Sequence, residues 1–215
     1  MAHEWHESKS INGATNAKTA QPWLSKVPER CRRGADSLRQ VIIRDARPDE
    51  AAAVGELRVA AYRALGLLPA GSEYAQTLRG LGFDGDRGDR GDRAVLVAAD
   101  EAGNQILGTV TLESFEPGSE LAKDQTEADI RAFAVAPRAQ GQGVGRELLL
   151  AVIERAENRG LRRLRLCTQP AMRAAQHLYV TTGFHRTPDL DWEPRPGLIL
   201  RAYELPLPLG AAPRA

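Results

Sequence analysis

Apolar residues recur along the middle of the chain with two spacings, which predict alternating strands and helices. Apolar or alternating runs predict strands over residues 41–44, 95–99, 106–112, 130–135, 161–167 and 198–205. Helical spacing, with proline or aspartate before it and glycine after it, predicts helices over about 49–65, 72–81, 143–158 and 170–182. The strands over 130–135 and 161–167 flank a helix, so we expect them to be parallel neighbours in one sheet. The pattern therefore indicates an α/β domain.

Outside this pattern, the two ends of the chain are polar and aperiodic. We expect a poorly ordered N-terminal extension over residues 1–39, one domain over 40–206, and a C-terminal tail over 207–215. A start codon assigned too early is an alternative origin of the extension. His3 and His6 miss the H-E-x-x-H spacing that brings two imidazoles together on a helix, so no metal site is expected.

The charge balance argues against a polyanionic partner. Lys and Arg total 29 against 28 Asp and Glu, for a formal net charge of +1. Such a chain offers no field that recruits nucleic acid or an anionic membrane, so we expect a small partner. No segment approaches the length of a membrane helix, and residues 1–30 lack a signal-peptide core, so a cytoplasmic protein is expected. The excess of Arg over Lys, with abundant Ala, suggests a bacterial source.

Neither cysteine carries a recognisable chemical motif. Cys31 and Cys167 are far apart, so reduced thiols are expected rather than a disulfide. Cys167 ends a strand pattern with no partner motif for a nucleophile, which favours a small buried strand residue. Residues 85–93 repeat Gly-Asp-Arg and are expected to form a solvated loop.

The most informative segment is a glycine-rich turn after the strand over 130–135, Gln140-Gly-Gln-Gly-Val-Gly-Arg146. Its glycines tolerate positive φ and allow close approach of a ligand, and the following helix begins with unpaired N–H groups at its positive end. These features predict a site for a pyrophosphate. A dinucleotide-binding turn needs glycine where Arg146 stands, and a phosphate loop needs Lys and a hydroxyl. A glycine-rich turn without a ligand remains the simplest alternative.

Two segments together resemble one known family. Gln140 to Gly145 resembles the Q/R-x-x-G-x-G signature of the GNAT superfamily of acyl-CoA-dependent N-acetyltransferases. Further along, Ala174 to Phe184 is similar to the A-x-x-L-Y-x-x-x-G-F ending of the same superfamily. The resemblance covers roughly residues 41–205. It implies the GNAT fold, in which a mixed central sheet has two splayed parallel strands and flanking helices.

The resemblance also implies acetyl-CoA as co-substrate. Backbone groups of Phe133, Ala134 and Val135 would bind the pantetheine arm, which lies between the splayed strands like an added strand. The pyrophosphate would lie against the turn, whose residues are Gln140, Gly141, Gln142, Gly143, Val144, Gly145 and Arg146. Fixed amide dipoles also stabilise charge that develops on a thioester carbonyl.

By the same resemblance, the reaction is N-acetylation of a primary amine by direct attack, with no acyl-enzyme. Tyr179 is the candidate general acid for the leaving thiolate, although on its own it reads as a core aromatic. Glu127 and Asp129 lie just ahead of the cofactor strand and share one face, so each is a candidate base acting through water, or else a solvated carboxylate. The alternative function is a non-catalytic acyl-CoA-binding or sensor module of the same fold.

The resemblance implies that the acceptor is an amine on a small molecule or a peptide. Residues that border its pocket by resemblance, or serve only in packing, are Tyr62, Leu67, Leu68 and Tyr74. Residues 186–197 either cap this side or form a plain connection. The carboxylates there that would attract a cation are Asp189, Asp191 and Glu193. Met172 stands where many relatives carry a pantetheine-binding Asn, so Gln169 or backbone would substitute. A homodimer is left open.

Overall fold

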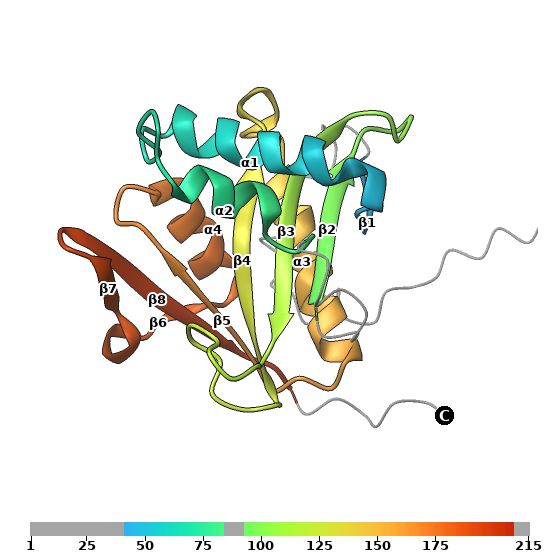
Figure 1. Cartoon of the computed structure of the whole chain (residues 1–215). Coiled ribbons are helices and arrows are strands. Elements are labelled where there is room, and N and C mark those ends of the chain that lie inside the picture. Colours follow the sequence, from blue (N-terminus) through green and yellow to red (C-terminus); the bar gives the residue numbers. More distant parts are fainter. Residues whose placement is uncertain (1–40, 84–92, 209–215) are drawn as a thin grey trace, which may run out of the picture. The chain divides into compact units, whose positions relative to one another are not determined.

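The computed structural model describes residues 41–83 and 93–208, whose helices and strands follow nearly the expected order (Figure 1). The elements are β1 (Ile42–Asp45), α1 (Ala51–Ala64), α2 (Tyr74–Gly80), β2 (Arg93–Ala99), β3 (Ile106–Ser114), β4 (Glu127–Val135), α3 (Val144–Asn158), β5 (Arg163–Thr168), α4 (Arg173–Thr182), β6 (His185–Arg186), β7 (Trp192–Arg195) and β8 (Leu198–Pro206). The extension expected over 1–39, Cys31, most of the Gly-Asp-Arg repeat and the end of the expected tail lie outside the described residues.

The strands form one mixed sheet. Its order is β1-β2-β3-β4-β5-β8-β6, and β7 pairs with β8. β4 and β5 are parallel and α3 connects them, whereas the other strand pairs are antiparallel. The expectation that the strands of the 130s and 160s are parallel neighbours is therefore confirmed, as is the α/β fold with a mixed sheet.

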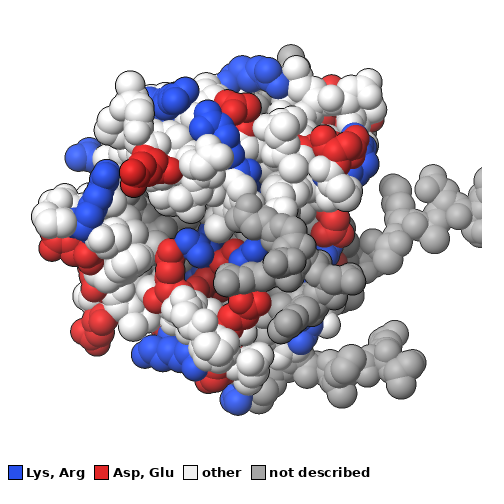
Figure 2. Space-filling view, in the orientation of Figure 1, with Lys and Arg blue, Asp and Glu red and all other residues white. Residues whose placement is uncertain are grey.

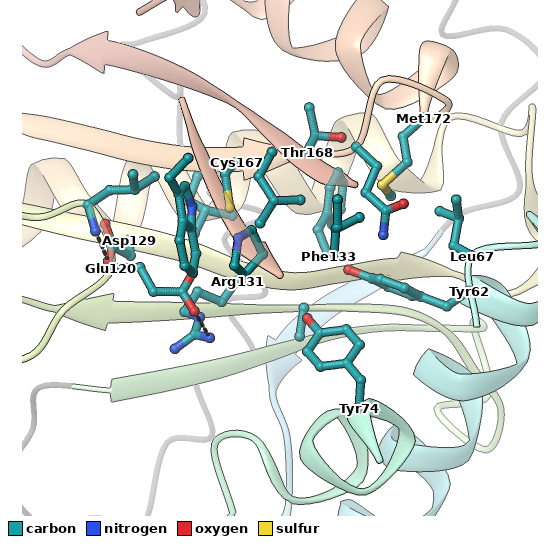
Figure 3. Close-up of a pocket in the computed structure, with 18 of the residues that line it drawn as sticks. Tyr62, Leu67, Tyr74, Glu120, Asp129, Arg131, Phe133, Cys167, Thr168 and Met172 are labelled. Carbon is teal, nitrogen blue, oxygen red and sulfur yellow. Dashed lines mark hydrogen bonds and ion pairs between the residues drawn. The ribbon is translucent and has the colours of Figure 1, made fainter. Parts of the chain in front are cut away.

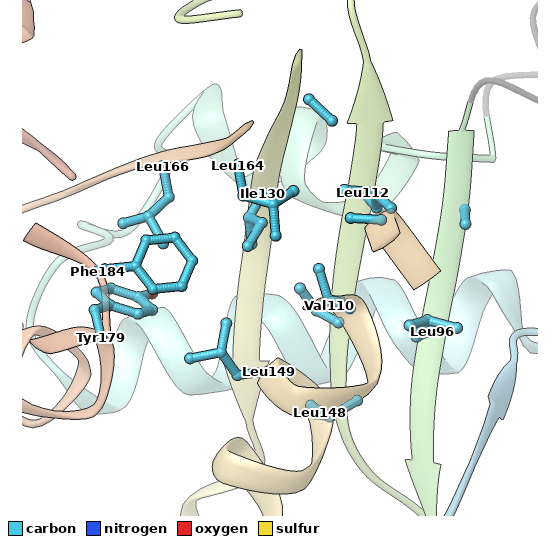
Figure 4. Packing of buried hydrophobic residues seen from close by; sticks show 14 of the residues in the cluster. Leu96, Val110, Leu112, Ile130, Leu148, Leu149, Leu164, Leu166, Tyr179 and Phe184 are labelled. Carbon is cyan, nitrogen blue, oxygen red and sulfur yellow. The ribbon is translucent and has the colours of Figure 1, made fainter. Parts of the chain in front are cut away.

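Helices cover both faces of the sheet. α1 and α2 lie on one face, and α3 and α4 lie on the other (Figure 1). Under α3, Leu148 and Leu149 pack into a buried cluster with Val110, Ile130 and Leu164 (Figure 4). Each of these side chains is at most 5% exposed, so each contributes roughly 1.5–3 kcal/mol to folding. A continuous core thus holds the sheet against α3 and fixes the helix whose first turn follows the glycine segment.

β4 begins earlier than the sequence pattern predicts. We expected the strand at residue 130, with Glu127 and Asp129 ahead of it, but both carboxylates lie within the strand. Parallel pairing with β5 begins at Glu127, opposite Arg163. The apolar pattern misses these positions because they carry charge, and the strand tolerates that charge because both carboxylates have hydrogen-bond partners.

β4 and β5 separate where a bulge interrupts β4. Their pairing ends at Ile130 and Leu166, and the register between β3 and β4 shifts just beyond it. Ala132, in this bulge, has φ of 48°, and it is the sole non-glycine residue with positive φ in the described ranges. Figure 1 shows β5 and β8 leaving at an angle to β4. The predicted splay of the two parallel strands is therefore present.

Candidate active site

A cavity of about 230 Å³ opens where β4 and β5 separate (Figure 3). Its walls come from α1, α2, the connection between β3 and β4, the ends of β4 and β5, α4, β7 and β8. The lining residues that the sequence pointed to as acceptor side chains are Tyr62, Leu67, Leu68 and Tyr74. All four therefore line one cavity, and their role toward an acceptor stays a prediction.

The cavity passes through the plane of the sheet. Ile130, Leu164 and Leu166 point to the α3/α4 face, since they belong to the cluster that packs under α3. Side chains alternate along a strand, so Asp129 points to the α1/α2 face. Tyr179 of α4 and Asp129 both line the cavity. One opening thus connects groups on opposite faces of the sheet.

The glycine turn adopts the conformation that its sequence predicts. Gly141 has φ of 74° and Gly143 has φ of 81°, both in the left-handed region. α3 begins at Val144, and within the described residues the N–H groups of residues 141–145 have no backbone hydrogen bond. Several donors therefore meet at the positive end of a helix, which fits an anionic group such as a pyrophosphate.

The turn lies beside the free edge of β4. A Cβ built on Gly145 would lie 3.4 Å from the Phe133 ring and 3.5 Å from Val135, so the first turn of α3 packs closely on the strand. Ala134 and Val135 pair with β3, while β5 has already left the other edge. Gln140 Nε2 donates to the carbonyl of Val135 at 3.2 Å. The open edge offers backbone groups to an extended ligand that carries amides.

Tyr179 is both a core residue and a wall of the cavity. Its side chain is 3% exposed, and its ring centroid lies 6.1 Å from Phe133, 5.9 Å from Phe184 and 6.0 Å from Tyr203. Burial raises the pKa of its hydroxyl above the ordinary value, so the phenol is neutral. The helix that carries it ends at Gly183, with φ of 107°, as the sequence predicted.

Asp129 is a buried carboxylate on the cavity wall. It is 3% exposed and accepts hydrogen bonds from the N–H groups of Leu121 at 3.2 Å and Ala122 at 2.9 Å. Burial raises the pKa of this carboxyl to about 6, against the opposing effect of those two bonds. A carboxyl with that pKa is ionised at neutral pH and remains a usable base.

Glu127 shares the strand face of Asp129 but is not among the residues that line the cavity. It pairs with Arg165 at 3.0 Å and Arg163 at 3.3 Å, and it accepts the N–H of Lys123 at 2.8 Å. The two carboxylates together therefore hold the connection between β3 and β4. Of the two candidate bases, the structure brings only Asp129 to the cavity.

Sequence reasoning missed several lining residues. Glu120 forms an ion pair with Arg131, which also contacts Glu113 at 3.2 Å. Cys167, expected to be buried, is half-buried and lines the cavity, because β4 no longer covers this end of β5. Burial raises the pKa of its thiol to about 12, so it is not a thiolate at neutral pH. The alternation of side chains along β5 was the one sequence signal that could have indicated the position of Cys167.

The segment over 186–197 reaches the cavity, but not through its carboxylates. Asp191 accepts two hydrogen bonds from Arg186 at 2.7 Å and one from the N–H of Ala202, and Glu193 accepts the N–H of Gly197. The residues of this segment that line the cavity are Trp192, Pro194 and Arg195. Asp191 and Glu193 hold the hairpin together, and none of the three carboxylates of this segment lines the cavity.

Charge on the visible surface is mixed. Figure 2 shows basic and acidic residues interspersed, without a face of one sign. Among residues 41–83 and 93–208, no cluster of His, Cys, Asp and Glu has the arrangement of a metal site. No helix in these ranges has the length and apolar character needed to span a membrane.

Comparisons with known proteins identify the fold. A family model described as the Acetyltransferase (GNAT) family matches residues 56–184. A GNAT-family acetyltransferase structure from Staphylococcus aureus Mu50 has a TM-score of 0.61 and 16% identity, over 79% of this chain and 100% of that one. No curated protein sequence matches the chain.

Two further structures have more specific descriptions. The ribosomal-protein-S18-alanine N-acetyltransferase from Escherichia coli has a TM-score of 0.57 and 20% identity, over 80% of this chain and 96% of that one. A phosphinothricin acetyltransferase from Sinorhizobium meliloti in complex with AcCoA has a TM-score of 0.58 and 21% identity, over 80% and 91%. At these identities the similarity shows a shared fold.

Proposed function

Because the chain belongs to the acetyltransferase (GNAT) family, we propose that it transfers an acetyl group from acetyl-CoA to a primary amine. The observation that carries the proposal is the cavity through the sheet, which brings Tyr179 and Asp129 to one opening beside a glycine turn. Two structures of the same fold, an N-acetyltransferase of ribosomal protein S18 alanine and a phosphinothricin acetyltransferase in complex with AcCoA, support this choice of donor and acceptor.

The donor would bind on the α3/α4 face. The N–H groups of residues 141–145 hold the pyrophosphate, with Gln140 and Arg146 at the two ends of the turn. The free edge of Phe133, Ala134 and Val135 bonds the amides of the pantetheine arm. In this arrangement the thioester would lie near the bulge at Ala132, where β4 and β5 part.

The amine would approach from the α1/α2 face. Asp129 takes a proton from the ammonium or from an intervening water, so that a neutral nitrogen attacks the acetyl carbonyl. Glu127 acts indirectly, because it holds the connection between β3 and β4 whose N–H groups bond Asp129. The new C–N bond forms as the C–S bond breaks, and the acetyl group moves directly to nitrogen.

Tyr179 would complete the reaction on the opposite face. Its neutral hydroxyl donates a proton to the departing thiolate and recovers one from solvent. A covalent route through Cys167 is disfavoured, because a thiol with a pKa of about 12 is a poor nucleophile at neutral pH. The base and the acid thus act from opposite sides of the sheet.

Two measurements test the proposal. Calorimetry with coenzyme A should give saturable heat, and acetyl-CoA with a panel of primary amines should release free thiol only when an amine is present. Coenzyme A binding without thiol release from any amine would favour the second candidate, a non-catalytic acyl-CoA-binding module. Absence of coenzyme A binding would reject both. We assign the activity to the domain over residues 40–206.

A further inference from the structure

The wall of the cavity on the α1/α2 face is largely aromatic. Tyr62 of α1 and Tyr74 of α2 have ring centroids 6.3 Å apart in an edge arrangement (Figure 3). Trp192 of β7 lines the same cavity. Tyr74 is 44% exposed and Trp192 is 37% exposed, so their rings present apolar surface to an incoming molecule.

Among the charged groups of the cavity, one carboxylate is available to pair with a cationic nitrogen. They are Glu120, Asp129, Arg131 and Arg195, which cancel in sum. Glu120 is already paired with Arg131, whereas Asp129 has no Arg or Lys ion pair within the described residues. A polycation would leave its further ammonium groups without carboxylate partners in this cavity. The electrostatics therefore suit a monoamine.

We propose that the acceptor is a primary monoamine carried on an aromatic body. Its ring lies against Tyr74 and Trp192, and its nitrogen faces Asp129. This inference rests on the proposed function, because it names the acceptor of the same site.

The test compares amines at saturating acetyl-CoA by the rate of thiol release. We expect kcat/KM for 2-phenylethylamine to exceed that for spermidine, and for a peptide with one lysine, by about 30-fold. Tyr74→Ala and Trp192→Ala should raise KM for 2-phenylethylamine while changing KM for butylamine little. Tyr74→Phe, which keeps the ring, should behave like the wild type.

The outcomes separate this inference from the function on which it rests. If coenzyme A binds and spermidine or the peptide is the better acceptor, the acceptor class is wrong and acetyl transfer stands. Equal KM changes for both monoamines in Tyr74→Ala and Trp192→Ala would also overturn it. If coenzyme A gives no heat in calorimetry, both proposals fail together.

A separate observation concerns Thr168, the last residue of β5. It is 3% exposed, and its Oγ1 has no hydrogen-bond partner among the described residues. Thr168 lines the cavity just beyond Leu166, the last residue of β5 that pairs with β4, and alternation along the strand points it to the same face as Leu166 (Figure 3). A buried hydroxyl without a partner is unfavourable, so its partner is expected in a ligand.

The neighbours of Thr168 offer one other polar side chain to a ligand, the amide of Gln169. Met172 supplies only a thioether, which is a weak acceptor. The main-chain carbonyl of Gln169 already accepts a bond from the side chain of Gln176 at 2.8 Å. We infer that the Thr168 hydroxyl binds an amide of the pantetheine arm as the arm passes between β4 and β5. This inference also rests on the proposed function.

A pair of substitutions and a truncated ligand test this role. Thr168→Val keeps the shape and removes the hydroxyl, whereas Thr168→Ser keeps the hydroxyl. We expect Thr168→Val to weaken coenzyme A binding about 10-fold in calorimetry and to leave adenosine 3′,5′-bisphosphate, which lacks the arm, unchanged. Thr168→Ser should bind both like the wild type, and unliganded Thr168→Val should melt no lower than the wild type.

Three results decide the matter. Equal coenzyme A affinity in Thr168→Val and the wild type would overturn the assignment. Loss of affinity for both ligands would show a general distortion rather than a lost bond, and would overturn it as well. Failure of the wild type to bind coenzyme A would reject the proposed function itself.

Discussion

The two sides of the cavity use different parts of the chain. On the α3/α4 face, the groups available to a donor are mostly main-chain ones, the N–H groups of residues 141–145 and the free edge of β4. On the α1/α2 face, the groups are side chains from distant segments, such as Tyr62, Asp129 and Trp192. A site made of main-chain groups needs only a few residues, such as glycines, that fix the backbone conformation. A site made of side chains can change its specificity through substitution without altering the fold.

The largest effect, on coenzyme A affinity, is expected from a substitution that disrupts the glycine turn on the α3/α4 face. Gly143→Val places a β-branched residue at φ of 81°, a conformation that such residues avoid, and so disrupts the turn. Because several N–H donors are lost together, we expect the dissociation constant of coenzyme A to rise about 100-fold in calorimetry. Acetyl transfer should fall in proportion.

A matched control isolates the position of the glycine. Gly118 has φ of 100° and open space around its Cβ position, so Gly118→Val introduces the same kind of backbone strain away from the turn. It should lower the melting temperature and leave coenzyme A affinity intact. Unchanged affinity in Gly143→Val would remove the turn from the donor site.

The second-largest effect is expected at Tyr179, a side chain on the α3/α4 face, where the other donor-binding groups are mostly main-chain ones. Tyr179→Phe keeps the ring contacts with Phe133 and Phe184 and removes the hydroxyl. We expect kcat to fall about 100-fold, with the dissociation constant of coenzyme A changed less than about 2-fold. An unchanged kcat would leave Tyr179 with a packing role alone.

The third effect concerns Asp129 and carries a pH signature. A base must be ionised, so kcat at saturating amine should rise with pH and level off above about 6, the pKa of this carboxyl. Asp129→Asn should abolish that rise and lower the plateau about 30-fold. A pH profile shared by both proteins would assign the titration to another group.

The same carboxyl makes a prediction for stability. Its folded-state pKa of about 6 lies above the ordinary value for aspartate, so the folded state favours the protonated form. The stabilisation is complete below about pH 4 and is lost as the pH rises through 6. Urea unfolding should show this loss in the wild type and a flatter dependence in Asp129→Asn.

The smallest effect is expected at Gln140, a side chain on the main-chain side. Gln140→Ala removes a single exposed bond to the carbonyl of Val135, so coenzyme A affinity should change by no more than about 3-fold. A loss as large as that of Gly143→Val would show that side chains matter as much as main chain on this face. Calorimetry under the same conditions decides between them.

The difference between the two sides also explains what the sequence could predict. Gly141 and Gly143 were identifiable because few residues other than glycine adopt their conformations, and Tyr179 lies in a helix that ends at a glycine of predictable geometry. Such local requirements leave a trace in neighbouring residues. The parallel pairing of β4 and β5 followed from the apolar runs on either side of α3.

The residues that escaped prediction depend on contacts between distant segments. The ion pair between Glu120 and Arg131 joins a connection to a strand, and nothing in the local pattern announces it. Cys167 was expected to be buried because strands are usually covered, and only the departure of β4 exposes it. The charge of Asp129 hid its strand, since the two N–H groups that stabilise it come from residues 121 and 122.

The short seam between β4 and β5 has a mechanical consequence. The two strands pair only over Glu127–Ile130 and Arg163–Leu166. The two halves of the sheet are therefore joined by a short stretch of backbone pairing. An extended molecule bound between the two strands beyond this paired stretch would bridge the two halves of the sheet, as an added strand does. Deuterium uptake at those amides of residues 133–135 that face the free edge should then slow when coenzyme A binds, while the far strands β1 and β2 exchange as before.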